Sequence, residues 1–246
     1  MFRYEGSSWF GFFWIKVPPQ YKSPKALKIT TFQGVFLKNN YICFQKNKMN
    51  AYYERLYNHL KRIVPITEKD VELMMSYAKI TKLKKKSFLF QGGEIARYVG
   101  FVNQGVLRYY YTDEQGEEHI IYFAQEEWWI GDLNSFYGQV PTPYYLQALE
   151  NTELFLFTRE NFDSVRSQIP AYDEYVKVRH AKATAARLDS MMSLRAEHAE
   201  DRYEKLLKSF PDIFQRVPQH YIASYLGIKP QSLSRIRKII AEKKKR

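Results

Sequence analysis

Apolar side chains along the chain follow a helical spacing, then an alternating one, then a helical one again. Residues 51–62 have helical spacing, and Thr67 opens a second helix with Asp70 three residues later, as in a capping box. From about Ile80 the pattern alternates, and beyond Asn161 it returns to helical spacing. These changes predict a β-rich region that lies between helical segments.

The alternating region consists of short aromatic and β-branched runs separated by glycine-containing turns. The expected strands are Ile80–Leu83, Ser87–Phe90, Tyr98–Asn103, Val106–Tyr111, His119–Phe123, Tyr145–Leu149 and Leu154–Thr158. Evenly spaced short strands of this kind predict a small antiparallel β-roll of the jelly-roll type, and the chain as a whole an α+β fold. Its tyrosines, including Tyr109, Tyr110, Tyr111 and Tyr122, are expected to pack in the core and across strands rather than to form a ligand cage.

After the strands, a short helix is expected over Phe162–Ser167 and a longer one from Pro170 to about Leu194. In the long helix, apolar and small residues recur at spacings of 3, 4, 3 and 4, which is typical of a two-helix coiled coil. The residues of this seam are Val178, Ala181, Ala185, Leu188 and Met192. The helix could instead pack on the roll of its own chain, but the small alanines favour pairing of two chains.

Residues 219–238 carry the most informative pattern of the chain. Apolar residues at 222, 223 and 226 share one face of a helix, and those at 233 and 236 share one face of a second helix. Gly227 can adopt the left-handed backbone of a sharp turn, and Pro230 suits the first position of a helix. The outward residues suit base edges and phosphates. The candidate DNA-binding residues of this helix-turn-helix are Gln219, His220, Lys229, Gln231, Ser232, Ser234, Arg235, Arg237 and Lys238.

Charge supports this interpretation, because it is concentrated at the two ends of the chain. Of the net charge of +12, residues 1–48 carry +7 and residues 216–246 carry +8, which leaves −3 for the middle. A basic block beside such a hairpin is the electrostatic footprint of a duplex-binding module, although a merely solvated basic face is the alternative. The mildly acidic middle is not expected to bind nucleic acid.

Composition excludes several other classes of protein. The single cysteine, Cys43, rules out an intrachain disulfide and any four-cysteine zinc or iron–sulfur site. No apolar run approaches the roughly 20 residues that a membrane span needs. We therefore expect no metal, no cofactor, no membrane contact and a cytoplasmic location.

The first 48 residues differ from the rest. The apolar segment Trp9–Ile15 is too short to cross a membrane, and no small-residue cleavage site follows it. A basic, proline-broken stretch comes next. Residues 1–48 are either a poorly ordered arm or an over-extended gene start.

The order of parts and several motifs resemble the cyclic-AMP receptor protein and fumarate–nitrate regulator (Crp/Fnr) family over about residues 50–240. The motifs are Gly105-Val-Leu-Arg-Tyr with the 113–116 hairpin, Gly131-Asp132, Arg202-Tyr-Glu-Lys-Leu-Leu, Ile222-Ala-Ser-Tyr-Leu-Gly-Ile and Leu233-Ser-Arg-Ile-Arg. The resemblance implies a β-roll sensor-like domain over residues 49–168, a dimerisation helix over 169–196 and a helix-turn-helix domain over 197–246. It also implies a homodimeric transcriptional regulator without catalytic activity, whose partners are double-stranded DNA and RNA polymerase.

The ligand cassette departs from the family pattern. In members that bind cyclic nucleotide, the cassette begins with Gly-Glu and ends with Arg-Ser, and the arginine pairs with the buried phosphate. Here Gly131-Asp132 and Thr142-Pro143 take these positions, and nothing cationic lies between Asp132 and Ala148. With Tyr144, these positions form a degenerate pocket, Gly131, Asp132, Thr142 and Tyr144, that is not expected to respond to cyclic AMP. The effector, if there is one, is a different molecule.

The recognition helix also departs from the family pattern. Typical members present a basic residue, then Glu and, four residues later, Arg, whereas this chain has Pro230, Gln231 and Arg235. Arg235 suits guanine O6 and N7, and Gln231 can pair with adenine N6 and N7. The preferred operator should therefore differ from the usual one.

Two interpretations compete with a regulator. A cupin-like metalloenzyme would need a cluster of histidines with a carboxylate, but His119 is the single histidine of the predicted roll. A small-ligand-binding β-roll or cupin-like module with a non-specific basic tail is the second alternative. The salt dependence and sequence dependence of binding would distinguish this module from a regulator. Binding through phosphate contacts alone loses affinity with rising salt equally on every duplex.

Overall fold

The structure, a computed structural model, describes residues 52–243. The leader over residues 1–48 and the last residues of the basic tail, 244–246, lie outside the described residues. The helices are α1 (Glu54–Lys61), α2 (Glu68–Ser76), α3 (Leu133–Gly138), α4 (Arg159–Gln168), α5 (Pro170–Ala196), α6 (Ala199–Ser209), α7 (Ile213–Arg216), α8 (Gln219–Tyr225) and α9 (Pro230–Lys243). The strands are β1 (Lys79–Leu83), β2 (Phe88–Phe90), β3 (Val99–Gln104), β4 (Leu107–Thr112), β5 (Glu118–Ala124), β6 (Trp129–Ile130), β7 (Tyr144–Ala148) and β8 (Thr152–Phe157).

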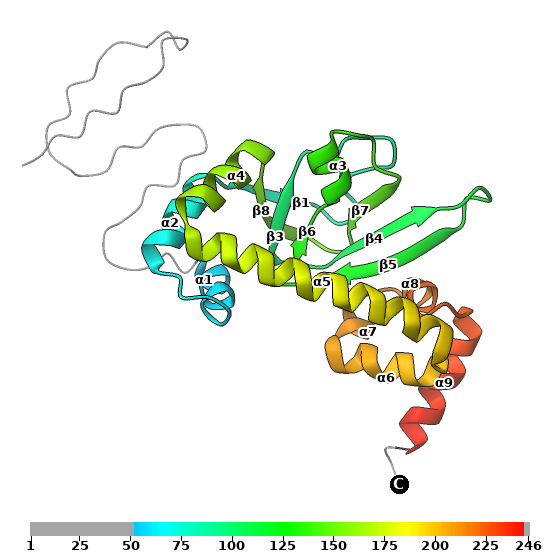
Figure 1. Cartoon of the computed structure of the whole chain (residues 1–246). Coiled ribbons are helices and arrows are strands. Elements are labelled where there is room, and N and C mark those ends of the chain that lie inside the picture. The colour runs from blue at the N-terminus through cyan, green and yellow to red at the C-terminus, as the bar shows by residue number, and fades with distance from the viewer. Residues whose placement is uncertain (1–51, 244–246) are drawn as a thin grey trace, which may run out of the picture. The chain divides into compact units, whose positions relative to one another are not determined.

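Two antiparallel sheets of four strands each form the β-roll (Figure 1). Their strand orders are β1-β8-β3-β6 and β2-β7-β4-β5. The predicted roll is confirmed, and the ends of the expected strands differ from the observed ones by one or two residues. The sequence pattern missed β6, because two residues are too few to show alternation, and it also missed α3 and α7.

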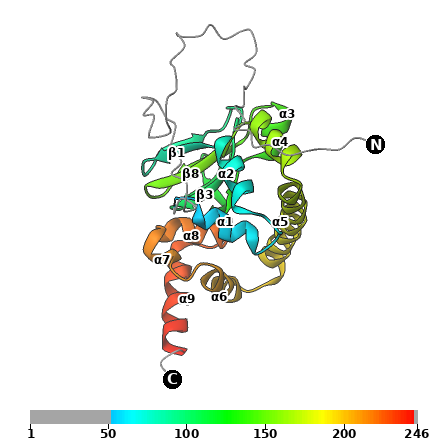
Figure 2. The same ribbon diagram turned by 90° about the vertical axis from the view of Figure 1, so that its left-hand side faces the viewer.

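The first sheet is covered by helices on the outside of the roll. Side chains of α1, α2, α4 and the first turns of α5 pack on β3 and β8 around Phe101, Phe155 and Trp129. In Figure 2, α1 and α2 lie in front of the roll and α5 runs along its right-hand side. Thr67 caps α2 in the predicted capping box, since its hydroxyl accepts from the Asp70 amide at 3.2 Å.

The second sheet is buried on both faces. Successive residues of a strand point to opposite faces, so Leu107 and Tyr109 of β4 pack between the two sheets. On the other face, Tyr110 of β4 and Phe123 of β5 belong to a second apolar cluster, which includes residues of α6, α8 and α9. The helical C-terminal region and the roll therefore share one core.

The tyrosines of this sheet mostly pack as predicted. Tyr109 stacks on Tyr122 with ring centroids 4.7 Å apart, and Tyr110 stacks on Tyr145 at 5.0 Å. Tyr109 and Tyr110 are buried, whereas Tyr111 is exposed near the hairpin and stacks on His119 at 4.9 Å. All four named tyrosines thus pack across strands, and Tyr111 alone among them does so at the surface.

Gly105, between β3 and β4, has a backbone that requires glycine. Its φ of +107° lies outside the range that side chains favour, and an added Cβ would lie 2.8 Å from the Cα of Thr152. The two strands can therefore cross close to β8 only because residue 105 has no side chain.

Gly105→Ala should lower the free energy of unfolding by about 2–5 kcal/mol, since backbone strain and overpacking against Thr152 add. Gly116→Ala is the matched control, because Gly116 also has a positive φ, +81°, but no atom within 4 Å of an added Cβ. The control should lose about 1–2 kcal/mol. Denaturant unfolding of both variants measures the difference, and equal losses would show that the close approach to Thr152 is unimportant.

Candidate functional site

Helices α8 and α9 form the helix-turn-helix. Ile222, Ala223 and Leu233 are fully buried and pack the two helices together. Gly227 has φ +65°, and the amide of Ile228 donates to the Ala223 carbonyl at 3.0 Å, so the chain leaves α8 through a left-handed glycine. The predicted turn geometry is confirmed.

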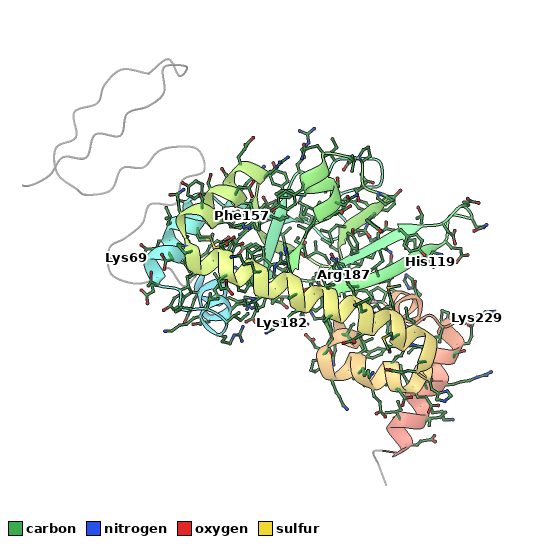
Figure 3. The ribbon with its side chains drawn as sticks, in the orientation of Figure 1. Lys69, His119, Phe157, Lys182, Arg187 and Lys229 are labelled. Carbon is green, nitrogen blue, oxygen red and sulfur yellow. The ribbon has the colours of Figure 1, made fainter. Side chains whose placement is uncertain are left out.

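The outer face of this unit is polar and open to solvent. The exposed residues among the candidates for DNA contact are Gln219, His220, Lys229, Gln231, Ser234, Arg235 and Lys238. Figure 3 shows Lys229 projecting from the turn before α9. Ser232 is half-buried, and the guanidinium of Arg237 lies 4.6 Å from the centre of the Phe214 ring on α7. Arg237 is therefore partly held by its own domain.

A groove of about 520 Å³ runs beside the recognition helix. The groove is lined by the start of α8, by residues of α9 and by apolar side chains of α6. The lining residues are Tyr203, Leu207, Gln219, Ser234, Arg237, Lys238, Ile240 and Ala241. Gln219 of α8 is thus presented on one surface with Ser234 and Lys238 of α9.

Two contacts tie the turn to the preceding helices. The Arg202 guanidinium of α6 donates to the Leu226 carbonyl at 2.8 and 3.2 Å. This carbonyl, at the end of α8, thereby gains a hydrogen-bond donor that the helix itself does not supply. Leu194, in the last turn of α5, approaches to 3.5 Å of the position that a Cβ on Gly227 would take. The end of the long helix therefore touches the turn of the helix-turn-helix.

Arg108 of β4 links the roll to α8, which the sequence did not reveal. Its guanidinium lies 4.0 Å from the ring centres of both Tyr110 and Tyr221, pairs with both oxygens of Glu118, and donates to Gln147 at 2.7 Å. Burial raises the pKa of Tyr110 to about 12, so the phenol stays neutral and Glu118 alone balances the cation. A fully paired buried arginine here joins two parts of the chain.

Two further contacts fasten the same surfaces. The Ser224 hydroxyl of α8 donates to the Glu118 carbonyl at 2.9 Å and accepts from the Ile120 amide at 3.1 Å. Arg216 of α7 pairs with Glu126 at 2.8 Å and with Glu150 at 2.6 Å. The hydrogen bond to Glu126 is the main cause of a raised Arg216 pKa.

The degenerate cassette is closed by its own hydrogen bonds. Asp132 is 7% exposed, caps α3 through the amides of Asn134 and Ser135, and accepts the Thr142 hydroxyl at 2.6 Å. Gly131 has φ +143°, and Tyr144 donates its amide to the Thr142 hydroxyl at 3.2 Å. The one charged side chain of the pocket thus has structural partners.

Cations approach the roll from outside the cassette, and the sequence pattern did not predict them. Arg187 of α5 interacts electrostatically with Tyr109 and Tyr122, whose pKa values are raised chiefly by burial. In Figure 3, Arg187 lies on the side of α5 toward the roll and Lys182 on the other. Arg179 lies 5.4 Å from the centre of the Trp129 ring. These guanidinium groups therefore face aromatic side chains of the roll.

The long helix has two different halves. Tyr172, Tyr175 and Val176 are buried on the roll, so the alternative of packing within the chain holds for the first turns. From Ala181 onward most of the described side chains of the helix are exposed, and Leu188 and Met192 are 57% and 67% exposed. Leu188 and Met192, two residues of the predicted seam, are thus large apolar side chains that are exposed to solvent in the single chain.

Comparisons with known proteins agree with this architecture. Residues 80–168 match the family model of the cyclic nucleotide-binding domain. No curated protein sequence matches the chain.

Solved structures with the same fold cover both the roll and the helical region. FixK2 from Bradyrhizobium japonicum has a TM-score of 0.58 at 17% identity, over 68% of this chain and 85% of that one. CooA (a mutant) from Carboxydothermus hydrogenoformans has a TM-score of 0.54 at 18% identity, over 68% and 78%. The c-di-GMP responsive regulator CLP from Xanthomonas campestris has a TM-score of 0.53 at 14% identity, over 72% and 93%.

These structures are Crp/Fnr regulators, and the chain has their fold. The resemblance inferred from sequence motifs is therefore confirmed at the level of the fold. Among the described residues, no helix combines the length and apolarity needed to cross a bilayer, and no three His, Cys, Asp or Glu side chains are grouped to hold a metal ion.

If Asp132 is structural, Asp132→Ala should lower the free energy of unfolding by about 2–4 kcal/mol, because α3 loses its cap and the buried Thr142 hydroxyl loses its acceptor. Thr142→Val should cost about 1 kcal/mol. The double variant should cost less than the two single changes together, since they remove the same hydrogen bond. Chemical unfolding measures all three, and strictly additive losses would contradict the coupling.

Proposed function

We propose that the protein is a sequence-specific, DNA-binding transcriptional regulator that acts as a homodimer and has no catalytic activity. The observation that carries this proposal is the two-sided character of α9. Its inner residues Leu233, Ile236 and Ile240 are buried against the domain, whereas Gln231 and Arg235 are exposed. An exposed helix face with arginine and glutamine suits the major groove.

The exposed half of α5 supports homodimerisation through this helix. Leu188, Met191, Met192 and Leu194 are between 49% and 67% exposed, which is unusual for such side chains in a monomer. A second copy of the same helix would cover them and place two α9 helices on two half-sites. RNA polymerase is the expected downstream partner, as for other regulators of this fold.

Cyclic AMP is not the effector in this proposal. The cassette has no cation between Asp132 and Ala148, and its carboxylate already caps α3 and binds Thr142. A cyclic phosphate placed there would meet Asp132, which repels it, and would lose its hydration.

Arg235→Ala should weaken binding to the preferred duplex by about 1–3 kcal/mol and binding to random duplex far less, because a lost bidentate base contact removes discrimination. The preferred sequence is first selected from a random duplex pool with the wild-type protein, and fluorescence anisotropy then gives both affinities. Equal weakening on both duplexes would assign Arg235 to phosphate contact. A wild-type protein that selects no sequence would overturn the proposed function.

Leu188→Asp should disfavour the dimer by several kcal/mol, since it buries a carboxylate against its symmetry mate. Sedimentation equilibrium of the wild type and the variant, with and without DNA, measures the change. Lys182→Asp, on the same exposed half of α5 but outside the seam, is the control and should remain dimeric. A wild type that is monomeric in both conditions would contradict pairing through α5.

Cyclic AMP and cyclic GMP should bind no tighter than about millimolar and should leave operator affinity unchanged. Isothermal titration calorimetry tests binding, and repeating the DNA titration at saturating nucleotide tests coupling. Arg187→Ala shows whether any residual binding uses the cation on α5. Micromolar binding with a linked gain in DNA affinity would place the protein among the nucleotide-responsive regulators.

A further inference from the structure

His59 of α1 is a titratable side chain that connects three other elements of the fold and is only 16% exposed. Its Nε2 lies 2.7 Å from the Tyr175 hydroxyl of α5, and its Nδ1 lies 3.3 Å from the Glu127 carboxylate in the turn between β5 and β6. The imidazole also packs on the Phe101 ring of β3, with ring centres 5.5 Å apart. His59 therefore joins α1 to the roll and to the first half of α5.

The backbone around Glu127 holds its carboxylate at this position. Glu127 has φ +69°, a conformation that a residue other than glycine keeps only where its surroundings fix it. Its amide donates to the Val102 carbonyl at 2.9 Å, and the Val102 amide donates to the Trp128 carbonyl at 2.9 Å. The Arg62 guanidinium, just after α1, pairs with the same carboxylate. The turn thus presents a fixed hydrogen-bond acceptor to His59.

The partners of His59 assign the hydrogen atoms of its ring. Although burial acts in the opposite direction, hydrogen bonds from Arg62 and His59 lower the pKa of Glu127, so its carboxylate is ionised and can only accept. A neutral imidazole has one N–H donor and one acceptor nitrogen. Nδ1 therefore carries the hydrogen, and Nε2 accepts the O–H of Tyr175. This directed chain of hydrogen bonds requires the neutral form of His59.

A proton on Nε2 would reverse the hydrogen bond to Tyr175. Both nitrogens of an imidazolium are donors, so the hydroxyl hydrogen of Tyr175 would have to turn away from the ring. Tyr175 is 1% exposed, and within residues 52–243 its hydroxyl has no second acceptor at hydrogen-bond distance. The neighbouring Trp129 ring, 6.2 Å away between centres, offers an N–H donor. Protonation would therefore leave a buried hydroxyl hydrogen unpaired, which is costly.

The charges that face His59 come from three sides. Burial is the main cause of its lowered pKa, and Glu127 acts in the opposite direction. Arg62 from the end of α1 and Arg179 from α5 add to the effect of burial. Phe101, the contact from β3, carries no charge. Because the ordinary value is 6.5, His59 is neutral at pH 7 and takes up a proton only in acid.

We propose that His59 is an acid-sensitive link between α1 and α5. At neutral pH the hydrogen bonds from Tyr175 through His59 to Glu127 hold α1 against the first half of α5, and a proton on Nε2 breaks them and releases α1. In the proposed regulator, acid would thereby loosen the attachment of the dimer helix to the roll. The link itself depends on contacts within a single chain, so it does not rest on DNA binding.

Hydrogen exchange of the amides at residues 58–61 tests the release of α1. After correction for the intrinsic effect of pH on exchange, their protection in the wild type should fall about tenfold between about pH 7.5 and about pH 5.5. His59→Gln keeps an amide oxygen that can accept from Tyr175 but cannot take up a proton. Protection in this variant should therefore change less than about twofold.

The pH dependence of unfolding gives a second measurement. A group whose pKa is lowered on folding stabilises the folded state above its unfolded pKa, and this contribution is lost as the pH falls through the folded pKa. The unfolding equilibrium constant of the wild type should therefore rise about fivefold more than that of His59→Gln from about pH 7 to about pH 5. Tyr175→Phe removes the stranded hydroxyl, so in an NMR titration its His59 should take up the proton at a higher pH than in the wild type.

His198→Gln is the matched control, because His198 is exposed and its side chain makes no cap hydrogen bond at the start of α6. It should behave as the wild type in both measurements. Equal pH dependence of the wild type and His59→Gln would overturn the link. A wild-type His59 that titrates at or above 6.5 would also overturn it, and that titration requires no variant to fold. Neither result bears on the proposed function, which the DNA affinity of Arg235→Ala tests separately.

Discussion

The packing of β4 and β5 between two cores is the constraint on which the rest of the structure depends. One face of the pair closes the roll through Leu107 and Tyr109, and the other carries α8 through Tyr110 and Phe123. Arg108 occupies this second face at 3% exposure, between the rings of Tyr110 and Tyr221. Removing one partner of such a buried ion pair leaves an uncompensated charge, so neither half of the interface can change alone.

This arrangement brings the degenerate cassette of the roll and the helix-turn-helix close together. Alternate residues of one strand face the two regions. Tyr109 faces the side of Arg187, and its neighbour in the chain, Tyr110, faces α8. A molecule that moved Tyr109 would strain a backbone that already has an irregular register between Tyr109 and Tyr110. In the proposed regulator, a change at Tyr109 would therefore reach the face of β4 that carries α8 through one peptide unit.

Sequence periodicity predicted the elements well where each one has its own signal. The strands, the Thr67 capping box, the glycine turn at Gly227 and the start of α9 at Pro230 follow from local preferences of single residues. Contacts between distant elements have no local signal. Arg108 is one cation in an aromatic strand, and nothing in its neighbourhood reveals that Tyr221, more than a hundred residues away, completes its site.

Leu194 at the end of α5 reaches the turn at Gly227, and the Arg202 side chain fixes the carbonyl beside that turn. A paired α5 would therefore set the angle and separation of the two α9 helices as one rigid frame. Inserting one base pair between half-sites rotates them by about a tenth of a helical turn relative to each other. A frame of this kind could not follow that rotation, so in the proposed regulator the spacing of the operator would depend on α5 as much as on the residues that contact the bases.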